Sequence, residues 1–377
     1  MRGIKLGIVG GGPGSFIGFT HRLAAKMDEE FALVGGVFSS DYAKSVKFAR
    51  SIDLDVKRVY RSVDELIERE RALPVDGRMT AVTIATPNYL HYDAARKLIR
   101  AGFHVICDKP VTMTCAEAER LEKMVGERGT VFCLTHNYTG YPMVREARKL
   151  IEKGTLGRIQ KIDVQYYMGA FNPLVHDKKN WKSIWRFDPS KAGISCNVAD
   201  LGTHAFNLVE YITQIEVKAV LADLNTLYDG LPLDLDATIL LRFGGNLKGV
   251  LRSSHIATGE ENALEIKIYG DRMGLRWEEE NPNCLYLLSD NKPAQVYSRG
   301  KSSNTKFSLE GTRVYRGLPE GFFESFANLY KGAAKAIRTK RETSGAFPTI
   351  HDGVRTMKFV EAAVSSHKKG NKWVELR

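Results

Sequence analysis

Short apolar runs of strand length alternate with amphipathic helical patterns through the first third of the chain. The runs are rich in β-branched residues, and the segments between them carry apolar residues at helical spacing. The predicted strands are residues 4–9, 31–38, 80–85, 104–107 and 131–134, and the predicted helices between them are 41–52, 62–71, 88–100 and 114–127. Because repeated strand–helix–strand units close by right-handed crossovers, this pattern favours a parallel, doubly wound sheet, the architecture of a nucleotide-binding domain.

The pattern changes from about residue 157 to longer, two-faced strands. They cover residues 159–167, 217–228, 237–243, 247–255 and 263–269. Strands of this kind predict a large, mostly antiparallel sheet that is covered on one side and open on the other. Since the open face must be hydrated or paired, we expect a homo-oligomer: a dimer, a tetramer or a larger assembly.

Together the two patterns predict an α/β plus α+β chain. Residues 1–136 form a dinucleotide-binding Rossmann domain, residues 137–348 form a substrate and oligomerisation domain, and residues 349–377 form a C-terminal helix and tail. We expect the active site between the two sheets. The segment 171–192, rich in His, Lys, Trp and Pro, precedes a helix expected to begin near residue 194 and is a candidate lid.

Composition agrees with this prediction and excludes several classes of protein. With 43% hydrophobic residues among 377, the chain can bury a sizeable core. No apolar run approaches the roughly 20 residues that span a bilayer and no cleavable signal pattern is present, so we expect a cytoplasmic protein without a membrane partner. The five cysteines fit neither a zinc motif nor a disulfide framework, which predicts reduced thiols and no metal. The formal charge of +11 is scattered, which favours an anionic small ligand such as a dinucleotide over a nucleic acid.

A glycine-rich loop follows the first predicted strand. Glycines there let the backbone turn sharply and approach a pyrophosphate, whose charge is met by amide groups at the start of the next helix. Gly10 and Gly12 are the first two glycines of such a loop, and Gly18 serves as the third if the loop is three residues longer than usual. A purely structural turn is the alternative. The cofactor-binding residues expected here are Gly10, Gly12, Ser15, Phe16 and Ile17.

The second predicted strand ends beside the expected adenosine ribose. An acid at this position favours NAD, because it bonds the 2′-hydroxyl and repels a 2′-phosphate. Here Phe38 is followed by Ser39 and Ser40, with Lys44 within one helical turn. We therefore expect Ser39, Ser40 and Lys44 to contact the cofactor, and the choice between NAD and NADP stays open. Alternatively, one of the serines only caps the following helix.

Two further segments follow strands at the carboxyl edge of the predicted sheet, where ligands bind in such folds. Residues 85–91 read A-T-P-N-Y-L-H, and residues 107–110 read C-D-K-P. With the glycine loop, they resemble the Gfo/Idh/MocA family of glucose-fructose oxidoreductase and inositol dehydrogenase relatives, which carries A-T-P-N-x-x-H and E-K-P segments. Lys109 and Pro110 match, and Asp108 stands where Glu is usual. The cofactor contacts that the resemblance implies are Thr86, Pro87, Asn88, His91, Asp108, Lys109, Asn137 and Arg186.

The third signature of the family is an Asp and a His four residues apart on a helix, supplied here by Asp200 and His204. This spacing puts both side chains on one helical face. The chain has Ser195, Cys196 and Asn197 in place of the family's frequent run of glycines. The resemblance extends from residue 4 to residue 373, and it implies that the C-terminal segment packs back onto the first domain. Taken singly, each signature has an alternative explanation. Lys109 could be a surface lysine at a turn, and Asp200 and His204 could be a solvated pair on a helix.

The resemblance implies an NAD(P)-dependent dehydrogenase that acts on CH–OH groups. The nicotinamide accepts the hydride, and His204, whose residue type titrates at about pH 6.5, takes the hydroxyl proton. Asp200 then orients the histidine or binds a neighbouring hydroxyl, and Lys109 holds the reacting oxygen. The substrate-binding residues expected on these grounds are Lys109, Tyr138, His176, Arg186, Asn197, Asp200 and His204.

The segments P-G-S-F-I-G, T-H-N-Y-T-G-Y-P and D-L-G-T-H resemble a sub-branch whose members oxidise sugars, glycosides or inositols. Some of those relatives oxidise ring carbon C3 and keep the dinucleotide tightly bound. Two alternatives stay open. One is a reductase of an imine, biliverdin or dihydrodiol. The other is a non-catalytic dinucleotide and sugar sensor that resembles the galactose-repressor relatives, although the presence of both Lys109 and His204 favours an enzyme.

Overall fold

The computed structural model describes residues 3–341 and 344–376. The chain divides into two compact units, each of which is assembled from separated stretches of sequence. Unit 1 comprises Met1–Thr112, Ala116–Asn137 and Phe322–Val354, and unit 2 comprises Met113–Cys115, Tyr138–Gly321 and Arg355–Arg377.

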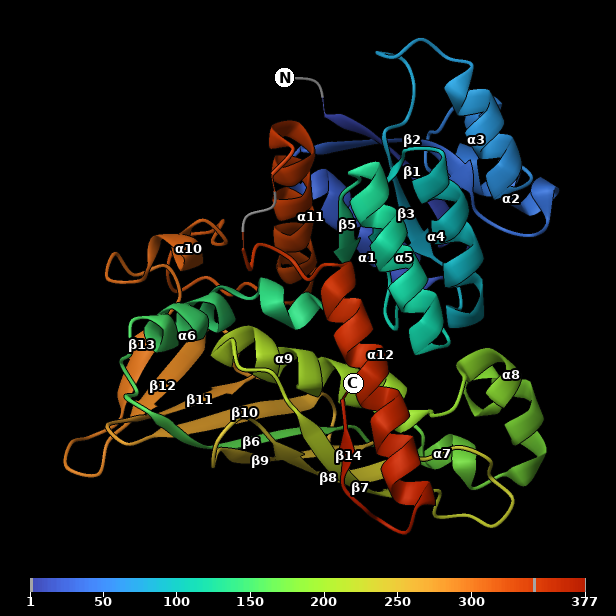
Figure 1. The fold of residues 1–377 in the computed structure, drawn as a ribbon. Helices are drawn as coiled ribbons and strands as arrows, with labels where there is room; N and C mark the ends of the chain where they lie inside the picture. Colours follow the sequence, from blue (N-terminus) through green and yellow to red (C-terminus); the bar gives the residue numbers. More distant parts are fainter. Residues whose placement is uncertain (1–2, 342–343, 377) are drawn as a thin grey trace. The chain divides into compact units, whose positions relative to one another are not determined.

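Unit 1 contains a five-stranded parallel sheet, as the alternating pattern predicts (Figure 1). The strand order is β2-β1-β3-β4-β5, so the chain changes direction across the sheet between β1 and β3. Its strands are β1 (Ile4–Gly10), β2 (Phe31–Val37), β3 (Ala81–Ala85), β4 (His104–Cys107) and β5 (Phe132–Leu134), and its helices are α1 (Phe16–Met27), α2 (Tyr42–Ser51), α3 (Val63–Arg71), α4 (His91–Arg100), α5 (Cys115–Arg128) and α11 (Phe322–Thr339). Such a switch point is where ligands bind in doubly wound sheets.

Unit 2 is built on a nine-stranded sheet in which only β6 and β9 form a parallel pair among the described strands. The order is β13-β12-β11-β10-β6-β9-β8-β7-β14. The strands are β6 (Ile159–Tyr167), β7 (Ala219–Asn225), β8 (Asp236–Arg242), β9 (Lys248–Ser254), β10 (Ala263–Gly270), β11 (Gly274–Glu278), β12 (Cys284–Leu288), β13 (Gln295–Ser298) and β14 (Val374–Glu375). The expected fold class, Rossmann plus mostly antiparallel sheet, is confirmed.

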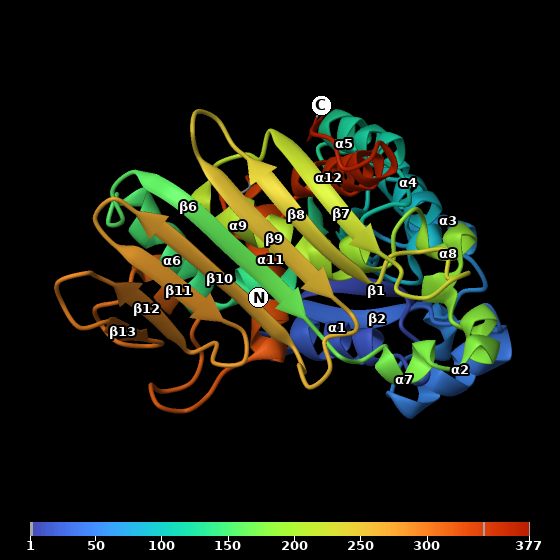
Figure 2. The same cartoon turned by 90° about the horizontal axis from the view of Figure 1, so that it is seen from below.

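One face of the nine-stranded sheet is covered and the other is open. Figure 2 shows the sheet with α6 (Pro142–Glu152), α9 (Thr203–Thr213) and α12 (Ile350–Lys368) behind it. Alternation along β8 follows from the pleat: Ala237, Ile239 and Leu241 are buried, whereas the residues between them are exposed. The apolar side chains of one face therefore form the core of unit 2.

The C-terminal segment is divided between the two units. Most of it belongs to unit 2, where Phe359 stacks on Phe206 with ring centroids 4.4 Å apart, and the Ala222 backbone N–H donates to Ser366 Oγ at 2.8 Å. Conversely, α11 belongs to unit 1, where Phe326 and Tyr330 join the core. Helical periodicity identifies a buried face but not its partner, and the packing of residues 349–377 on the first domain stays a prediction. The division into domains at residues 1–136, 137–348 and 349–377 stays a prediction.

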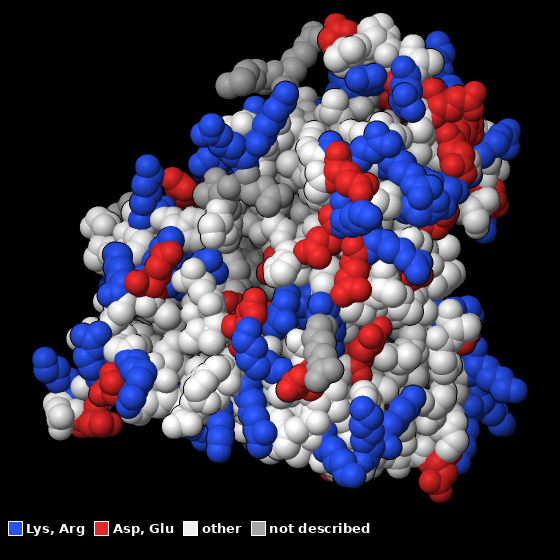
Figure 3. All heavy atoms as spheres, viewed as in Figure 1, with Lys and Arg blue, Asp and Glu red and all other residues white. Residues whose placement is uncertain are grey.

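Some features of the described residues bear on the location and chemistry of the chain. No described helix combines the length and the apolar character that a bilayer span requires. Within residues 3–341 and 344–376, no group of three or more His, Cys, Asp and Glu side chains is arranged to hold a metal ion. On the face shown in Figure 3, basic side chains are interspersed with acidic ones instead of forming a stripe.

Candidate active site

The first two glycines of the loop in unit 1 are required by close backbone contacts. A Cβ on Gly10 would lie 2.5 Å from the carbonyl oxygen of Ala85, and a Cβ on Gly12 would lie 2.3 Å from that of Phe38. Gly10 also has φ +84°, a left-handed conformation that favours glycine. The loop is therefore pressed between the ends of β2 and β3, at the switch point of the sheet.

Gly18 is the third glycine, and the loop is longer than usual. A Cβ on Gly18 would lie 2.3 Å from the Gly11 Cα, so only glycine lets α1 approach the loop this closely. Ser15 begins the helix as its N-cap, accepting a 3.0 Å hydrogen bond from the Gly18 backbone N–H. Phe16, next to the cap, has an exposed side chain. These contacts hold the loop and the start of α1 close together, as a pyrophosphate-binding turn requires.

The end of β2 lacks an acid, as the sequence indicates, and its two serines do not cap α2. The N-cap is Asp41, which accepts from the Lys44 backbone N–H at 3.2 Å. Ser39 supports this cap, since its Oγ accepts from the Asp41 backbone N–H at 3.1 Å. Ser40 and Lys44 are exposed. The Asp41 carboxylate is thus engaged with its own helix, and the hydroxyl and ammonium groups remain at the surface.

His91 connects the two motif segments that follow β3 and β4. Its ring is fully buried, with Nδ1 2.8 Å from the Pro110 carbonyl oxygen and Nε2 2.8 Å from that of Thr86. Carbonyl oxygens only accept, so both contacts are hydrogen bonds when the ring carries a proton on each nitrogen. In this arrangement His91 positions the segment that carries Thr86, Pro87 and Asn88, and a direct contact with a dinucleotide is not supported.

Asp108 and Lys109 lie at the carboxyl end of β4. One Asp108 oxygen accepts from the Lys109 backbone N–H and from Thr135 Oγ1, both at 3.0 Å, so the shorter acid fixes its own loop. Burial, and to a lesser degree the Lys109 charge, lower the pKa of His136 to about 3. His136 therefore stays neutral beside the lysine. Asn137, the next residue, is buried and its amide donates to Ser325 Oγ at 3.5 Å.

In unit 2 the helix expected near residue 194 begins later, with a π-helical turn at Val198–Gly202 that continues into α9. Asp200 lies in the π turn and His204 in the first turn of α9, so their spacing spans a junction and not one regular α-helix. The buried Asp234 carboxylate fixes the start of this turn by accepting from the Cys196 and Val198 backbone N–H groups at 3.0 and 2.9 Å. Such π turns frequently occur at functional sites.

Two basic side chains meet the Asp200 carboxylate. Arg186 Nε and His255 Nε2 each lie 3.4 Å from Asp200 Oδ2. Arg186 is partly exposed, whereas His255 is buried. The expected substrate residue Asn197 is also fully buried, and its amide donates to the backbone oxygen and the Oγ of Ser253 at 3.0 and 2.9 Å. Asn197 thus holds the π turn against β9, and a direct substrate contact is not supported for it.

His204 packs against two buried tyrosines. The Tyr138 ring lies 4.8 Å from the His204 ring, edge to face, and the Tyr166 ring lies 6.2 Å away. The two hydroxyls are 2.5 Å apart, and Tyr166 also donates to Asn262 Oδ1 at 2.6 Å. Burial raises the pKa of Tyr138, as do the charges of Glu279 and Asp200 to a lesser degree. Asp200 and His204 therefore share the surroundings of Tyr138, whose hydroxyl already has partners.

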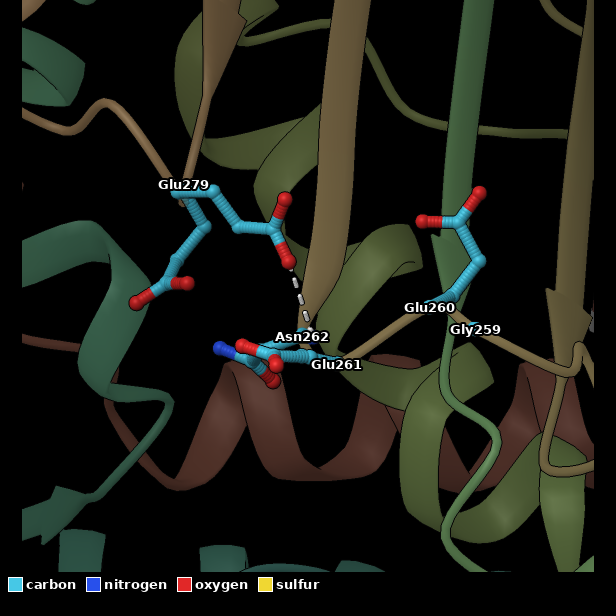
Figure 4. Close-up of a pocket in the computed structure, with 6 residues that line it drawn as sticks. Gly259, Glu260, Glu261, Asn262 and Glu279 are labelled. Carbon is cyan, nitrogen blue, oxygen red and sulfur yellow. Dashed lines mark hydrogen bonds between the residues drawn. The ribbon is translucent and has the colours of Figure 1, made fainter.

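A hollow of about 590 Å³ opens beyond Asn262 (Figure 4). Four carboxylates face it, and the Asn262 backbone N–H donates to one of them, Glu280, at 3.1 Å. Burial raises the pKa of Glu279, whose oxygen also accepts from the Tyr141 hydroxyl at 2.9 Å. The lining residues are Gly259, Glu260, Glu261, Asn262, Glu279 and Glu280. Asn262 is the residue that this hollow shares with the tyrosines around His204.

The candidate lid forms a small core of its own. It contains α7 (Asn172–Val175) and α8 (Pro189–Ala192), and its Val175, Phe187 and Ala192 pack with three leucines of the segment 231–235. His176 is exposed, and its Nδ1 lies 3.2 Å from the Tyr228 hydroxyl. Within this segment, Arg186 is the expected site residue that contacts Asp200.

The sequence analysis missed His255, Tyr166, Asn262 and Asp234. Tyr166 left a signal, because it continues the buried face of its strand: Ile162, Val164 and Tyr166 alternate with more exposed positions. His255 follows the buried Ser253 and Ser254 at the end of a predicted strand. A polar residue on the buried side of a predicted strand needs a partner and marks a candidate site. Asn262 and Asp234 come from segments that no local pattern connects with the helix of His204.

The fold and these residues define a class of protein: oxidoreductases with a dinucleotide-binding Rossmann unit and a second unit that bears an Asp–His pair. The family model described as "Oxidoreductase family, NAD-binding Rossmann fold" matches residues 4–136, and the model of the GFO/IDH/MocA C-terminal domain matches residues 144–276. The chain belongs to the Gfo/Idh/MocA oxidoreductase family. This confirms the family expected from the motifs and a nicotinamide dinucleotide as the cofactor of that family.

Similar proteins cover nearly the whole chain. An inositol dehydrogenase homolog from Azotobacter vinelandii, crystallised with NAD+, is 34% identical with a TM-score of 0.93 over 99% of this chain and 97% of that one. The uncharacterized oxidoreductase YfiI of Bacillus subtilis is 29% identical over 99% of this chain and 97% of its own length. The levoglucosan dehydrogenase of Pseudarthrobacter phenanthrenivorans is 27% identical over 100% of this chain and 99% of its own length.

Proposed function

We propose that the chain is an NAD(P)-dependent dehydrogenase that transfers hydride between nicotinamide and a secondary carbinol of a sugar, glycoside or inositol. The observation that supports it most is the Asp200 and His204 pair: Asp200 lies in the π turn, and His204 lies in the first turn of α9 against two buried tyrosines. Relatives point to the same substrate class: the Azotobacter homolog was also crystallised with NADH and myo-inositol, and another relative is a levoglucosan dehydrogenase.

The residues of unit 1 fit a dinucleotide. Gly10 and Gly12 let the loop approach the ends of β3 and β2, and Ser15 begins the helix whose first amides would meet the pyrophosphate. Ser39, Ser40 and Lys44 would hold the adenosine end, and Thr86, Pro87 and Asn88 would lie along the carboxyl edge of the sheet. When bound, the nicotinamide supplies the hydride acceptor. The surface hydroxyls and Lys44 admit NAD or NADP.

The side chains of the protein have two tasks in this reaction: to accept the hydroxyl proton and to stabilise the negative charge that develops on the oxygen. His204 accepts the hydroxyl proton as general base, and Asp200 orients a neighbouring hydroxyl or the imidazole. Lys109, which is the cation beside the neutral His136, holds the reacting oxygen and stabilises its alkoxide character. Lys109 belongs to unit 1 and His204 to unit 2, so their convergence on one substrate is part of the proposal.

The proposal is tested with a panel of inositols, sugars and glycosides, each offered with NAD+ and NADP+, while reduced cofactor is followed by absorbance near 340 nm. We expect turnover with at least one polyol. Lys109→Ala and His204→Ala should each lower turnover by roughly 100-fold or more while dinucleotide binding is kept. Unchanged turnover in both variants contradicts the assignment. Absence of turnover across the panel, with a dinucleotide bound, favours the sensor alternative.

We also propose that the open face of the nine-stranded sheet pairs with a second copy of the chain. Leu240 is exposed on this face between Thr238 and Arg242, and an apolar side chain there gains from being covered. Native mass spectrometry checks the assembly and the retention of dinucleotide together. A monomer at micromolar concentration would rule out the pairing.

A further inference from the structure

His255 is a buried polar group beside Asp200. Its ring is 2% exposed and stacks face to face on Phe171, with centroids 4.1 Å apart and planes 10° from parallel. The backbone around it is fixed: its N–H donates to the Leu235 carbonyl at 2.8 Å, and its carbonyl accepts from the Phe171 N–H at 3.1 Å. The imidazole therefore has one defined position at the end of β9.

Within the described residues, neither ring nitrogen of His255 has a hydrogen-bond partner at normal length. The polar group that its Nε2 faces is the Asp200 carboxylate, 3.4 Å away. Keeping a buried imidazole without a full complement of hydrogen bonds lowers stability, and such groups in native proteins call for an explanation. An apolar residue stacked on Phe171 would make the protein more stable. We therefore attribute the presence of an imidazole here to its interaction with Asp200.

The two basic groups on Asp200 differ in mobility and exposure. Arg186 comes from the 171–192 segment, is 40% exposed and lies over the Trp185 ring at 4.6 Å. His255 comes from the central part of the sheet and is buried. Because a buried ring on a strand loses less freedom than an exposed arginine, His255 is the group that can fix the carboxylate orientation.

We propose that His255 is a positioning residue for the reaction. Through Nε2 its imidazole fixes the orientation of the Asp200 carboxylate for the reaction, while the more exposed Arg186 exchanges between Asp200 and a substrate hydroxyl. This inference rests on the proposed function, since it assigns His255 a role through Asp200. It predicts that full turnover requires an N–H donor at this position and that an aromatic ring without a donor does not support it.

Two substitutions separate these contributions. His255→Phe keeps a ring on Phe171 and removes the donor, whereas His255→Gln places an amide N–H near the position of Nε2. We expect His255→Phe to lower kcat by about tenfold or more, as loss of one oriented group does, and His255→Gln to recover kcat to within about threefold of the unchanged protein. In the Asp200→Asn background, His255→Phe should cause no further loss, because the two residues act as a unit.

His367 provides a matched control. It forms another histidine–aspartate pair in unit 2, with Nδ1 3.6 Å from Asp223 Oδ1, but it faces β7 and not Asp200. His367→Phe should leave kcat unchanged. If His255→Phe does not fold, the ring ¹⁵N shifts of His255, assigned by their loss in His255→Gln, are compared between the unchanged protein and Asp200→Asn, and we expect them to move.

The outcomes distinguish this inference from the proposed function. Normal turnover in Asp200→Asn removes the role of Asp200 and with it the role of His255, whereas absence of turnover in the unchanged protein removes the proposed function. Impaired turnover in Asp200→Asn together with normal turnover in His255→Phe overturns the role of His255 alone. The role of His255 is also overturned if His255→Phe and His255→Gln lower kcat equally, or if the losses of kcat in His255→Phe and Asp200→Asn add in the double variant. Ring ¹⁵N shifts of His255 that stay the same in Asp200→Asn overturn it as well.

Discussion

Tyr166 lies at the centre of the hydrogen bonds that support His204. Its hydroxyl is 2.5 Å from that of Tyr138 and donates to Asn262 Oδ1 at 2.6 Å. Tyr166→Phe removes this hydroxyl and deprives the Tyr138 hydroxyl and Asn262 Oδ1 of a partner, which lowers the free energy of unfolding by about 1–3 kcal/mol. We expect that loss in urea denaturation, together with a decrease of kcat by about threefold or more as the His204 ring loses support.

Tyr269→Phe is the control for that variant, because Tyr269 is a half-buried tyrosine of β10 outside these contacts. Its unfolding free energy and kcat should match those of the unchanged protein. If Tyr166→Phe is as stable and as active as Tyr269→Phe, the tyrosine pair does not support the histidine.

At the scale of single residues, the sequence predicts the groups that carry a motif. Lys109, Asp200 and His204 are predicted from their flanking residues, and their catalytic roles stay part of the proposal. The structure also changes the role expected for two candidates, since His91 and Asn197 are fully buried and bond to backbone or to Ser253. Exposure depends on tertiary packing, which a motif does not encode.

The glycine loop and α1 act as one element, and Gly18 sets their approach. A Cβ at Gly18 would lie 2.3 Å from Gly11 Cα, so Gly18→Ala must move α1 away from the loop. We expect the Kd for dinucleotide to rise by about tenfold or more, equivalent to roughly 1.4 kcal/mol. Calorimetric titration with NADH and with NADPH measures it and resolves the cofactor preference in the same experiment.

Gly126→Ala in α5 is the matched substitution, since a Cβ there meets nothing within 4 Å. It should leave dinucleotide binding unchanged, and helix propensity predicts a gain of up to about 1 kcal/mol in stability. Unchanged dinucleotide affinity in Gly18→Ala would show that the loop does not depend on this contact.

Element by element, local patterns predict the strands of unit 1 closely and the start of the Asp200 helix poorly. The strand β4 occupies the predicted residues 104–107, because an apolar run between helical patterns has few alternatives. The π turn at Val198–Gly202 depends on Asp234, whose carboxylate accepts from its first backbone N–H groups. A residue so distant in sequence gives no periodic signal, so neither the later start nor the π geometry could be predicted.

For the whole molecule, the chain returns to its first unit near the end of the sequence. Residues Phe322–Val354 belong to unit 1, and Arg355–Arg377 belong to unit 2. The sequence predicts the C-terminal helix α12 but not α11, and helical periodicity does not show which sheet a helix covers. Fold class follows from pattern, whereas the assignment of late helices to units follows from complementary packing.

The central claim is that hydride passes from a carbinol carbon to nicotinamide on this chain. The most direct measurement uses carbon-deuterated myo-inositol and carbon-deuterated glucose, followed by mass spectrometry of the dinucleotide after one turnover. The account predicts one deuterium per turnover in the reduced nicotinamide from at least one of these compounds, and its loss in His204→Ala. Reduced dinucleotide that contains no deuterium, or no reduction of a bound dinucleotide by either compound, would contradict it.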